Sequence, residues 1–305
     1  MAEVQLPSTS KNIIVSGGAR GIGRALARYF LEAGHHVYIF DIQEDELEYA
    51  ATKHLEKYHQ KGLVGYAVCN LCDVEDIRKK VEQAAKFFKN KIDVLVNNGG
   101  IASPKWKDDK TMEAKETYDQ WVAYMETNLT APFAMSQACI PYMKHRESDS
   151  NNSEGADKDV AGPCIIRKSA LLPPFLKTHT NYAPTGPADI GSFRAHQSDP
   201  NQEGYAASKA GQLGLMQAMS ISLGPLGIRT NLVAPGRIKV AHESKEGDQN
   251  GESWENQHTD KDVDDHPTNR AGRPKDIADA CLYLMNAGFV NGVGLYPLVP
   301  MVATN

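Results

Sequence analysis

Apolar and polar positions along this 305-residue chain repeat with two different periods. Short runs rich in Val, Ile and other apolar residues are typical of buried strands. Such runs predict strands at 12–15, 36–40, 62–69, 92–96, 163–166 and 228–234. Longer stretches with apolar residues three or four positions apart predict helices at 24–33, 74–88, 118–143, 204–223 and 274–285. Because strands alternate with helices of this length, the pattern predicts an α/β fold with a parallel sheet and right-handed crossovers.

A glycine-rich turn joins the first predicted strand to the first predicted helix. Its sequence, SGGARGIG, places Gly17, Gly21 and Gly23 in the turn, with Arg20 and Ile22 between them. A turn in this setting aims backbone N–H groups and a helix N-terminus at a phosphate. A plain tight turn would use the same glycines, but the flanking strand and helix favour a dinucleotide site.

The second predicted strand ends in Asp41, 18 residues after Gly23. An acid at this point can hydrogen-bond the adenosine ribose hydroxyls and would repel a 2′-phosphate. Asp41 therefore favours NAD over NADP. Arg20 has the opposite effect, because it places a cation beside the phosphate turn.

Tyr205 and Lys209 lie four residues apart in the predicted helix 204–223, so their side chains share one face. A phenol exchanges protons poorly near neutrality because its reference pKa is about 10. A nearby ammonium group favours the phenolate and lowers that pKa. The pair is therefore a candidate proton-transfer device. The same spacing also occurs by chance on solvated helices, so the rest of the chain decides between the two interpretations.

In their order and spacing, the motifs resemble those of the short-chain dehydrogenase/reductase family over nearly the whole chain. The matching pieces are SGGARGIG, Asp73 in CDV, NNGG at 97–100, Asn128 in ETNL, YAASK at 205–209 and APG at 234–236. Among members of the family, the chain resembles the fungal and bacterial glucose dehydrogenase-like and the 3-oxoacyl-reductase-like proteins. The resemblance implies a Rossmann-type doubly wound parallel sheet with three α/β/α layers, formed by a single domain over 1–305.

The resemblance also implies the site residues. A catalytic tetrad of Asn, Ser, Tyr and Lys maps onto Asn128, Ser192, Tyr205 and Lys209, although Asn128 could instead be a buried amide satisfied by backbone. The implied cofactor-binding residues are Gly17, Arg20, Gly21, Ile22, Gly23, Asp41, Asp73, Asn98, Gly99, Tyr205, Lys209, Pro235, Gly236 and Ile238. The expected cofactor is NAD, with NADP possible.

The serine of the tetrad has two candidate positions. Ser192 lies 13 residues before Tyr205, the spacing found in many members of the family. The predicted fifth strand at 163–166 lies far upstream, however, and its own downstream serine is Ser169. An atypical insert, 167–189, separates the two serines. Its prolines exclude a central strand or a long helix; they are Pro173, Pro174, Pro184 and Pro187.

Two interpretations of the insert 167–189 are open. It is either a surface insertion that loops out of the strand end and returns to present Ser192, or a retained intron. Codons for RKS at 167–169 can contain the donor-like string GTAAGT, and TNY at 180–182 permits the branch-like string ACTAAC. Excision would join Ile166 to Ile190 through one new residue and give an unbroken strand that carries Ser192.

Composition matters mainly for what it excludes. The net charge of −5 arises in 241–266, where nine acids and two lysines give −7, and we interpret this stretch as one hydrophilic, solvated loop. Nothing indicates a nucleic-acid partner. Five cysteines without a signal-like start argue against a disulfide framework, and Cys69-x-x-Cys72 lacks the further ligands of a metal site. No apolar run reaches the length of a membrane span. We therefore expect a cytoplasmic protein with no metal and no membrane partner.

Three peripheral segments depart from the family's pattern. The stretch 146–162 is polar and predicted to be a flexible loop, and 241–270 corresponds to the variable substrate-binding loop. Val240 stands where the family often has a threonine that holds the nicotinamide carboxamide, so a backbone group or Ser244 must serve. The family's last-strand motif is absent after Gly292, so the last strand is expected to be frayed, edge-like or missing.

The function implied by the resemblance is reversible hydride transfer between a nicotinamide cofactor and an alcohol or ketone. Tyr205 would transfer the hydroxyl proton, and Lys209 would lower its pKa and bind the ribose. Ser192 would hydrogen-bond the substrate oxygen, and Asn128 would anchor a water relay to Lys209. The resemblance also implies a homodimer or homotetramer. The alternatives are a catalytically impaired dinucleotide-binding protein, and epimerase or dehydratase chemistry on the same scaffold.

Overall fold

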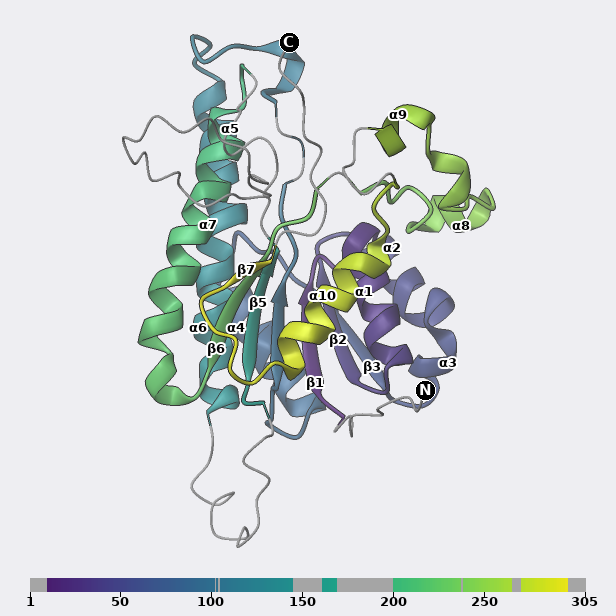
Figure 1. Ribbon diagram of the computed structural model, residues 1–305, viewed down its shortest axis with the longest axis vertical. Helices are drawn as coiled ribbons and strands as arrows, with labels where there is room; N and C mark the ends of the chain where they lie inside the picture. Colours follow the sequence, from purple (N-terminus) through teal and green to yellow (C-terminus); the bar gives the residue numbers. More distant parts are fainter. Residues whose placement is uncertain are drawn as a thin grey trace, which may run out of the picture.

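The computed structural model describes residues 10–101, 103, 105–144, 161–168, 200–236, 238–264 and 270–295. Within them lies one seven-stranded parallel sheet in the order β3-β2-β1-β4-β5-β6-β7 (Figure 1). Its strands are β1 (Asn12–Ser16), β2 (His36–Asp41), β3 (Val64–Val68), β4 (Val94–Asn97), β5 (Cys164–Lys168), β6 (Arg229–Val233) and β7 (Gly294–Leu295). The chain order reverses between β1 and β4, and a ligand crevice is expected at that reversal. The predicted doubly wound α/β fold is confirmed.

Helices cover both faces of this sheet (Figure 1). One face carries α1 (Gly21–Glu32), α2 (Glu44–Tyr49), the π-helical turn η1 (Ala50–His54), α3 (Glu56–His59) and α10 (Pro274–Asn286). The other carries α4 (Val74–Phe87), α5 (Thr117–Met125), the π-helical turn η3 (Glu126–Thr130), α6 (Ala131–Met143) and α7 (Glu203–Ser222). The short elements are η2 (Lys107–Asp109), η6 (Gly224–Leu226), α8 (Lys245–Gln249), η7 (Glu255–Gln257) and α9 (Asp260–Asp264).

The hydrophobic core forms two layers because successive strand residues point to opposite faces. In β1, Ile13 and Val15 pack toward α1 and α10, whereas Ile14 packs toward α4 and α6. All three side chains are fully buried. A central strand covered on both faces needs such a continuous apolar run, which is the pattern that the sequence showed.

The long predicted helix 118–143 is present but interrupted. Helices α5 and α6 are joined end to end by η3, a single π-helical turn that contains Asn128. Turns of this kind inside α-helices frequently mark functional sites. The π turn therefore distinguishes Asn128 from its helical neighbours, which the periodicity alone could not do.

Strand β5 extends further than the sequence pattern indicated. Arg167 and Lys168, predicted to begin the insert outside the sheet, pair with β6 opposite Leu232 and Val233. Arg167 is only 1% exposed, because the strand alternation turns it to the same face as Ile165. Its Nη2 donates to Ser136 Oγ at 3.3 Å and contacts Met219 Sδ, while Nε and Nη1 have no partner in the described part of the chain. Burial lowers the pKa of Arg167 to about 10.

The acidic segment also differs from expectation. The stretch 241–266 was predicted to be one solvated loop, but its described residues include α8, η7 and α9. Glu243 is 2% exposed and ion-paired, so the prediction is wrong for that residue. The short last strand, β7, forms with two residues beside β6. The polar loop up to 160, the insert from Ser169 onward, and Ser192 lie outside the described residues.

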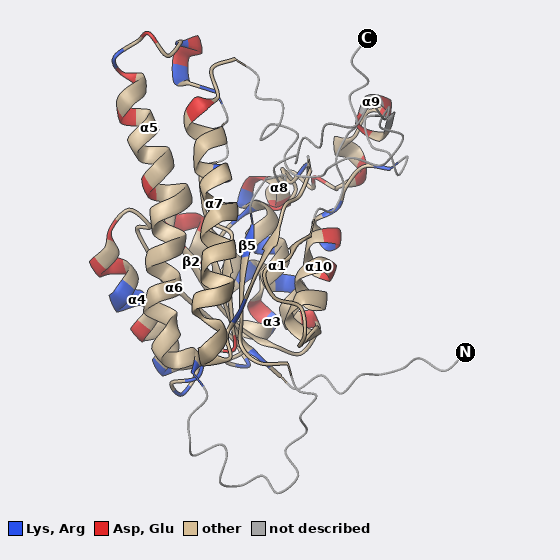
Figure 2. Cartoon of the chain, turned by 60° about the vertical axis from the view of Figure 1, so that its left-hand side comes forward, with Lys and Arg blue, Asp and Glu red and all other residues tan. Residues whose placement is uncertain are grey.

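Charged residues are unevenly distributed over the helices. Figure 2 shows α6 and α7 almost without Lys, Arg, Asp or Glu along their lengths. In α7 the charged residues are Glu203 and Lys209, and α6 has none. No helix among the described residues is long and apolar enough to cross a membrane.

Candidate active site

The pair Tyr205 and Lys209 lies in the first turns of α7, near the carboxyl end of the sheet. Lys209 Nζ lies 5.6 Å from the centroid of the Tyr205 ring. Helical spacing predicted that the two side chains share a face, and the structure brings them together. The arrangement places the Lys209 amine beside the Tyr205 ring, so the pair remains a candidate for proton transfer.

Lys209 is buried, and its pKa is strongly perturbed. Burial, together with the positive charge of Lys168 at the end of β5, lowers the pKa of Lys209 to about 7. Burial also lowers the pKa of Lys168 itself, to about 8. Perturbed values of this kind concentrate at functional sites. Lys168 is thus a second cation of the site, one that the sequence reading did not identify.

Asn128 connects three parts of the site and is fully buried. Its Oδ1 accepts a hydrogen bond from the Ile101 amide at 2.8 Å, and its Nδ2 donates to Ser208 Oγ at 3.1 Å. Ser208 Oγ in turn donates to the Tyr205 carbonyl at 2.8 Å. Gln212 Nε2 donates to the Asn128 carbonyl. Asn128 therefore fixes the segment after β4 against the helix that carries Tyr205 and Lys209.

Aromatic residues support the start of α7. The Tyr124 ring meets the Tyr205 ring edge-on with centroids 6.3 Å apart, and Trp106 packs on Tyr124 at 5.9 Å. Trp106 Nε1 donates to Glu203 Oε2 at 2.7 Å. A Cβ on Gly204 would lie 2.6 Å from the Tyr124 ring, so only glycine allows this approach. Trp106 and Tyr124 were missed by sequence reasoning because nothing in their local spacing relates them to Tyr205.

The glycine turn has the geometry of a phosphate cradle. A Cβ on Gly17, whose φ is +64°, would lie 2.6 Å from Gly99 Cα, and a Cβ on Gly23 would lie 1.9 Å from the Gly17 carbonyl oxygen. Within the described residues, the amides of Ile22 and Gly23 at the start of α1 have no partner. Such amides at a helix N-terminus suit an anion. The residues present therefore fit a dinucleotide pyrophosphate.

Asp41 and Asn98 hold this cradle together, whereas Asp73 caps the helix that follows β3. Asp41 Oδ2 accepts from the Ala19 amide at 3.1 Å, which places its carboxylate beside the turn. Asn98 Nδ2 donates to the Ser16 and Gly17 carbonyls, and its buried Oδ1 has no partner in the part of the chain described. Asp73 caps α4 by accepting from the Glu75 and Asp76 amides. These bonds align the ends of β1, β2 and β4.

The segment after β6 lies over the same turn. Ile238 forms a bridge with Gly272, and Val240 Cγ2 lies 3.4 Å from where a Cβ on Gly21 would stand. Pro235 and Gly236 lead from β6 into this segment. Ser244, considered as a carboxamide partner, instead caps α8: its Oγ accepts from the Gly247 amide and donates to the Ala241 carbonyl. Arg20 is exposed beside the turn.

Two further expectations concern sulfur and metals. Cys69 is buried, and burial raises its pKa to about 12. Cys72 is exposed and contacts Thr127 Oγ1 at 3.2 Å. Among the described residues, no group of three or more His, Cys, Asp or Glu side chains could hold a metal ion.

Comparison with known proteins identifies the family. The short chain dehydrogenase model matches residues 11–151, and the model described as enoyl-(acyl carrier protein) reductase matches residues 188–296. An uncharacterized oxidoreductase of Thermotoga maritima is 28% identical, with 92% of each chain covered. The 3-oxoacyl-[acyl-carrier-protein] reductase FabG of Chlamydia trachomatis is also 28% identical, covering 92% of this chain and 91% of the reductase.

Solved structures agree with these relatives. An apo SCOR enzyme from Clostridium thermocellum superposes with a TM-score of 0.66 at 26% identity, covering 95% of this chain and 91% of that enzyme. A short chain dehydrogenase from Burkholderia cenocepacia, solved in complex with NADP, has a TM-score of 0.65 at 23% identity, covering 94% and 96%. The two family matches leave 152–187 uncovered, the region that contains β5 and most of the atypical insert. The chain belongs to the short-chain dehydrogenase/reductase family, and it is an oxidoreductase of that family.

Proposed function

We propose that this protein transfers a hydride between a bound nicotinamide dinucleotide and an alcohol or ketone substrate. The observation that carries the proposal is the Tyr205–Lys209 pair, with Lys209 Nζ 5.6 Å from the Tyr205 ring centroid. The same sheet edge carries the glycine turn, whose amides at Ile22 and Gly23 suit a phosphate. A proton-transfer pair and a phosphate cradle on one edge are the two parts that such a reaction needs.

The residues of this chain have distinct roles in the proposed reaction. The nicotinamide ring, when bound, supplies or accepts the hydride. Tyr205 passes the hydroxyl proton to or from the substrate oxygen, and the Lys209 charge favours the phenolate form. Ser192 hydrogen-bonds the substrate oxygen. Asn128 keeps the 101 segment and α7 in register through Ile101 and Ser208.

Both dinucleotides fit parts of the site. Asp41, at the end of β2 and bonded to the Ala19 amide, favours NAD because its charge opposes a 2′-phosphate. Arg20, exposed beside the turn, favours NADP, which the Burkholderia dehydrogenase binds. We therefore propose NAD or NADP as cofactor, with their relative affinity decided by these two side chains.

Turnover and binding, measured separately, test the proposal. The protein is titrated with NADH and NADPH by nucleotide fluorescence, and oxidation is followed with polyols, sugars and 3-keto esters. Tyr205→Phe keeps the ring and removes the hydroxyl, so it should abolish turnover while dinucleotide binding stays nearly unchanged. Retained turnover in Tyr205→Phe would refute the role of the phenol.

A second candidate is a catalytically impaired dinucleotide-binding protein. Strand β5 favours it, because Lys168 puts a second cation at the strand end close enough to Lys209 to lower its pKa. Dinucleotide binding without turnover on any substrate of the panel would support this alternative. Interconversion of substrates without net cofactor oxidation would instead indicate epimerase or dehydratase chemistry.

We further propose that the chain assembles into a homodimer or homotetramer in the cytoplasm. The support lies on the helices that Figure 2 shows almost without charge. Phe133 of α6 is 47% exposed and Ile221 of α7 is 79% exposed. Large apolar side chains on an uncharged helix face are suited to a partner surface.

A further inference from the structure

A buried charge cluster joins helix α1 to the segment that lies over the glycine turn. Arg24 follows the turn directly and is 1% exposed. Its Nε donates to Glu243 Oε2 at 3.0 Å, and its Nη1 and Nη2 donate to the two oxygens of Asp248 at 2.7 and 3.1 Å. Nη2 also donates to the His242 carbonyl at 2.8 Å. One guanidinium group thus binds three residues of the 238–249 segment.

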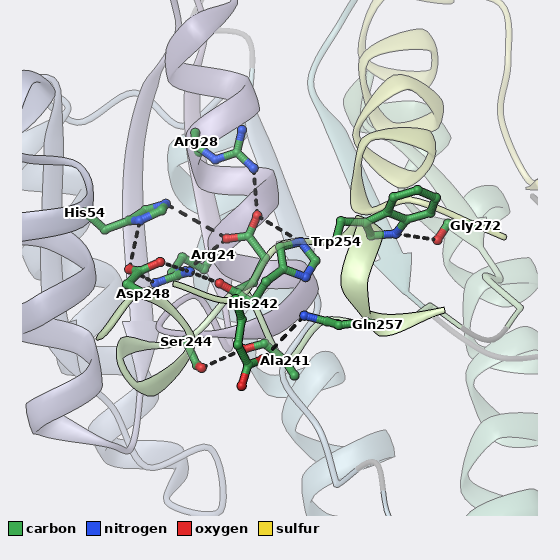
Figure 3. Close-up of polar contacts among 12 residues, drawn as sticks. Arg24, Arg28, His54, Ala241, His242, Ser244, Asp248, Trp254, Gln257 and Gly272 are labelled. Carbon is green, nitrogen blue, oxygen red and sulfur yellow. Dashed lines mark hydrogen bonds and ion pairs between the residues drawn. The ribbon is translucent and has the colours of Figure 1, made fainter. Parts of the chain in front are cut away.

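Arg28 and His54 complete the cluster. Arg28, one turn further along α1, donates from Nη2 to Glu243 Oε1 at 2.7 Å. His54 of η1 places Nδ1 3.3 Å from Asp248 Oδ2. Figure 3 shows Arg24, Arg28 and His54 directed toward the chain around His242 and Asp248. Burial opposes the ionised form of Asp248, but hydrogen bonds and the charge of Arg24 outweigh it and hold the pKa of Asp248 below its usual value.

The cluster acts at the point where the dinucleotide phosphates would bind. The Glu243 carbonyl accepts from the Gly21 amide at 2.6 Å, so the same residue touches the helix N-terminus with its backbone and Arg24 with its side chain. Val240 lies against Gly21. The amides of Ile22 and Gly23 are left without a partner in the described residues. The segment therefore covers the Gly21 side of the cradle.

The charges of this cluster do not behave as an ordinary solvent-exposed ion pair. A buried ion pair costs desolvation, and similar apolar residues often stabilise a fold as well or better. Removing one partner of such a pair, by contrast, leaves the other charge buried without a partner. Arg24 and Glu243 are both nearly inaccessible to solvent, and the ligand-facing segment contributes both acids. This geometry specifies one position of 238–249 relative to α1.

We propose that Arg24, Glu243 and Asp248 form a charge clamp that positions segment 238–249 over the glycine turn and thereby sets dinucleotide affinity. All three are positioning residues, since they act through the segment and not on the reacting atoms. The inference rests on the proposed function, because the ligand is the dinucleotide of that reaction. It assigns a role to Glu243 and Asp248, two acids otherwise counted as part of a solvated loop.

The test uses Glu243→Gln and Asp248→Asn in the full chain, each of which removes one charge and keeps the shape. The matched control is Asp279→Asn, which breaks the exposed Lys275–Asp279 pair of α10. NADPH and NADH dissociation constants, the KM and kcat split, and hydrogen exchange of 238–249 are measured for each. Because removing one partner uncouples a buried pair, Kd and cofactor KM should rise about tenfold while kcat changes little. Exchange of the segment should speed up in the free protein, and Asp279→Asn should match the wild type.

Two results would overturn the clamp: wild-type cofactor affinity in both variants, or unchanged exchange of 238–249. If Glu243→Gln fails to fold, both buried charges are removed together in the double variant Arg24→Met, Glu243→Met. Asp248→Asn still tests the more exposed carboxylate. If the wild type binds no dinucleotide, the proposed function fails, and the exchange measurement alone decides whether the clamp holds the segment.

Discussion

Lys168 and Lys209 lie close together at the carboxyl end of the sheet, and the charge of Lys168 contributes to lowering the pKa of Lys209 to about 7. Burial is the larger cause, and the like charge adds to it. The result matters because a lysine that loses its proton near neutrality no longer favours the Tyr205 phenolate. The strand that brings Lys168 to this point, β5, also carries the buried Arg167, whose Nε and Nη1 have no partner in the described part of the chain.

We predict that Lys168→Met raises the pKa of Lys209 by removing the like charge. Loss of turnover with rising pH should then begin at a higher pH than in the wild type. The stability of the fold also depends on this pKa. The pKa of Lys209 in the folded chain lies below its value in the unfolded chain, so unfolding takes up a proton. The free energy of unfolding therefore rises with pH between about 7 and about 10.5. Lys168→Met should flatten that rise.

Rate profiles and urea unfolding at several pH values check this prediction. Lys275→Met, which removes an exposed lysine of α10, serves as the control and should leave both curves in place. Superimposable curves for Lys168→Met and wild type would show that the two amines do not interact.

We predict that Arg167→Met stabilises the fold. Arg167 is buried with Nε and Nη1 unpaired in the described part of the chain, and an unsatisfied buried donor costs roughly 1–3 kcal/mol. Methionine fills a similar volume beside Met219 without polar atoms. The free energy of unfolding in urea should rise by about 2 kcal/mol. A loss of stability would mean that a group outside the described residues satisfies Arg167.

We predict that the mature message of this gene lacks the insert 167–189. The strand would then run from Ile166 through one new residue to Ile190, and Ser192 would follow it directly. The buried Arg167 and half-buried Lys168 of β5, together with the break between the family matches, support a discontinuity here. Transcript sequencing decides the matter, and a message that encodes the whole segment would leave it as a genuine insertion.

The effect of the segment 167–189 on the protein is tested by expressing the chain with it and without it. The shortened chain should be more stable than the full chain and should turn over substrate faster, because Ser192 would be carried at the end of β5. Equal stability and equal turnover of the two chains would contradict this expectation.

We predict that Phe133→Glu combined with Ile221→Glu converts an oligomer into monomers. A carboxylate buried in an apolar interface pays desolvation without a partner. Both positions are exposed on the single chain, so the fold itself should tolerate the change. Light scattering after size exclusion gives the mass, and Tyr283→Glu on exposed α10 is the control. A wild-type chain that is already monomeric would end the assembly proposal.

The sequence by itself determined the layered α/β fold, the glycine turn and the Tyr205–Lys209 pair. These depend on local spacing: strand runs, helical periodicity and residues four apart on one helix. It also placed Asp41 at the end of the second strand, whereas Asn128 was placed inside one continuous helix and the π turn around it was missed. Each of these features involves neighbours in the chain, so its geometry follows from one element.

Only the tertiary structure decided which charges are buried. Glu243 and Asp248 lie more than 200 residues from Arg24 in the chain, and nothing in an acidic segment distinguishes them from their solvated neighbours. Arg167 becomes a core residue, and Lys168 a half-buried one, only because β5 continues along β6. Burial depends on which distant elements pack together, so the free-energy cost of a charge, and the pKa of Lys209, could be known only from the folded chain.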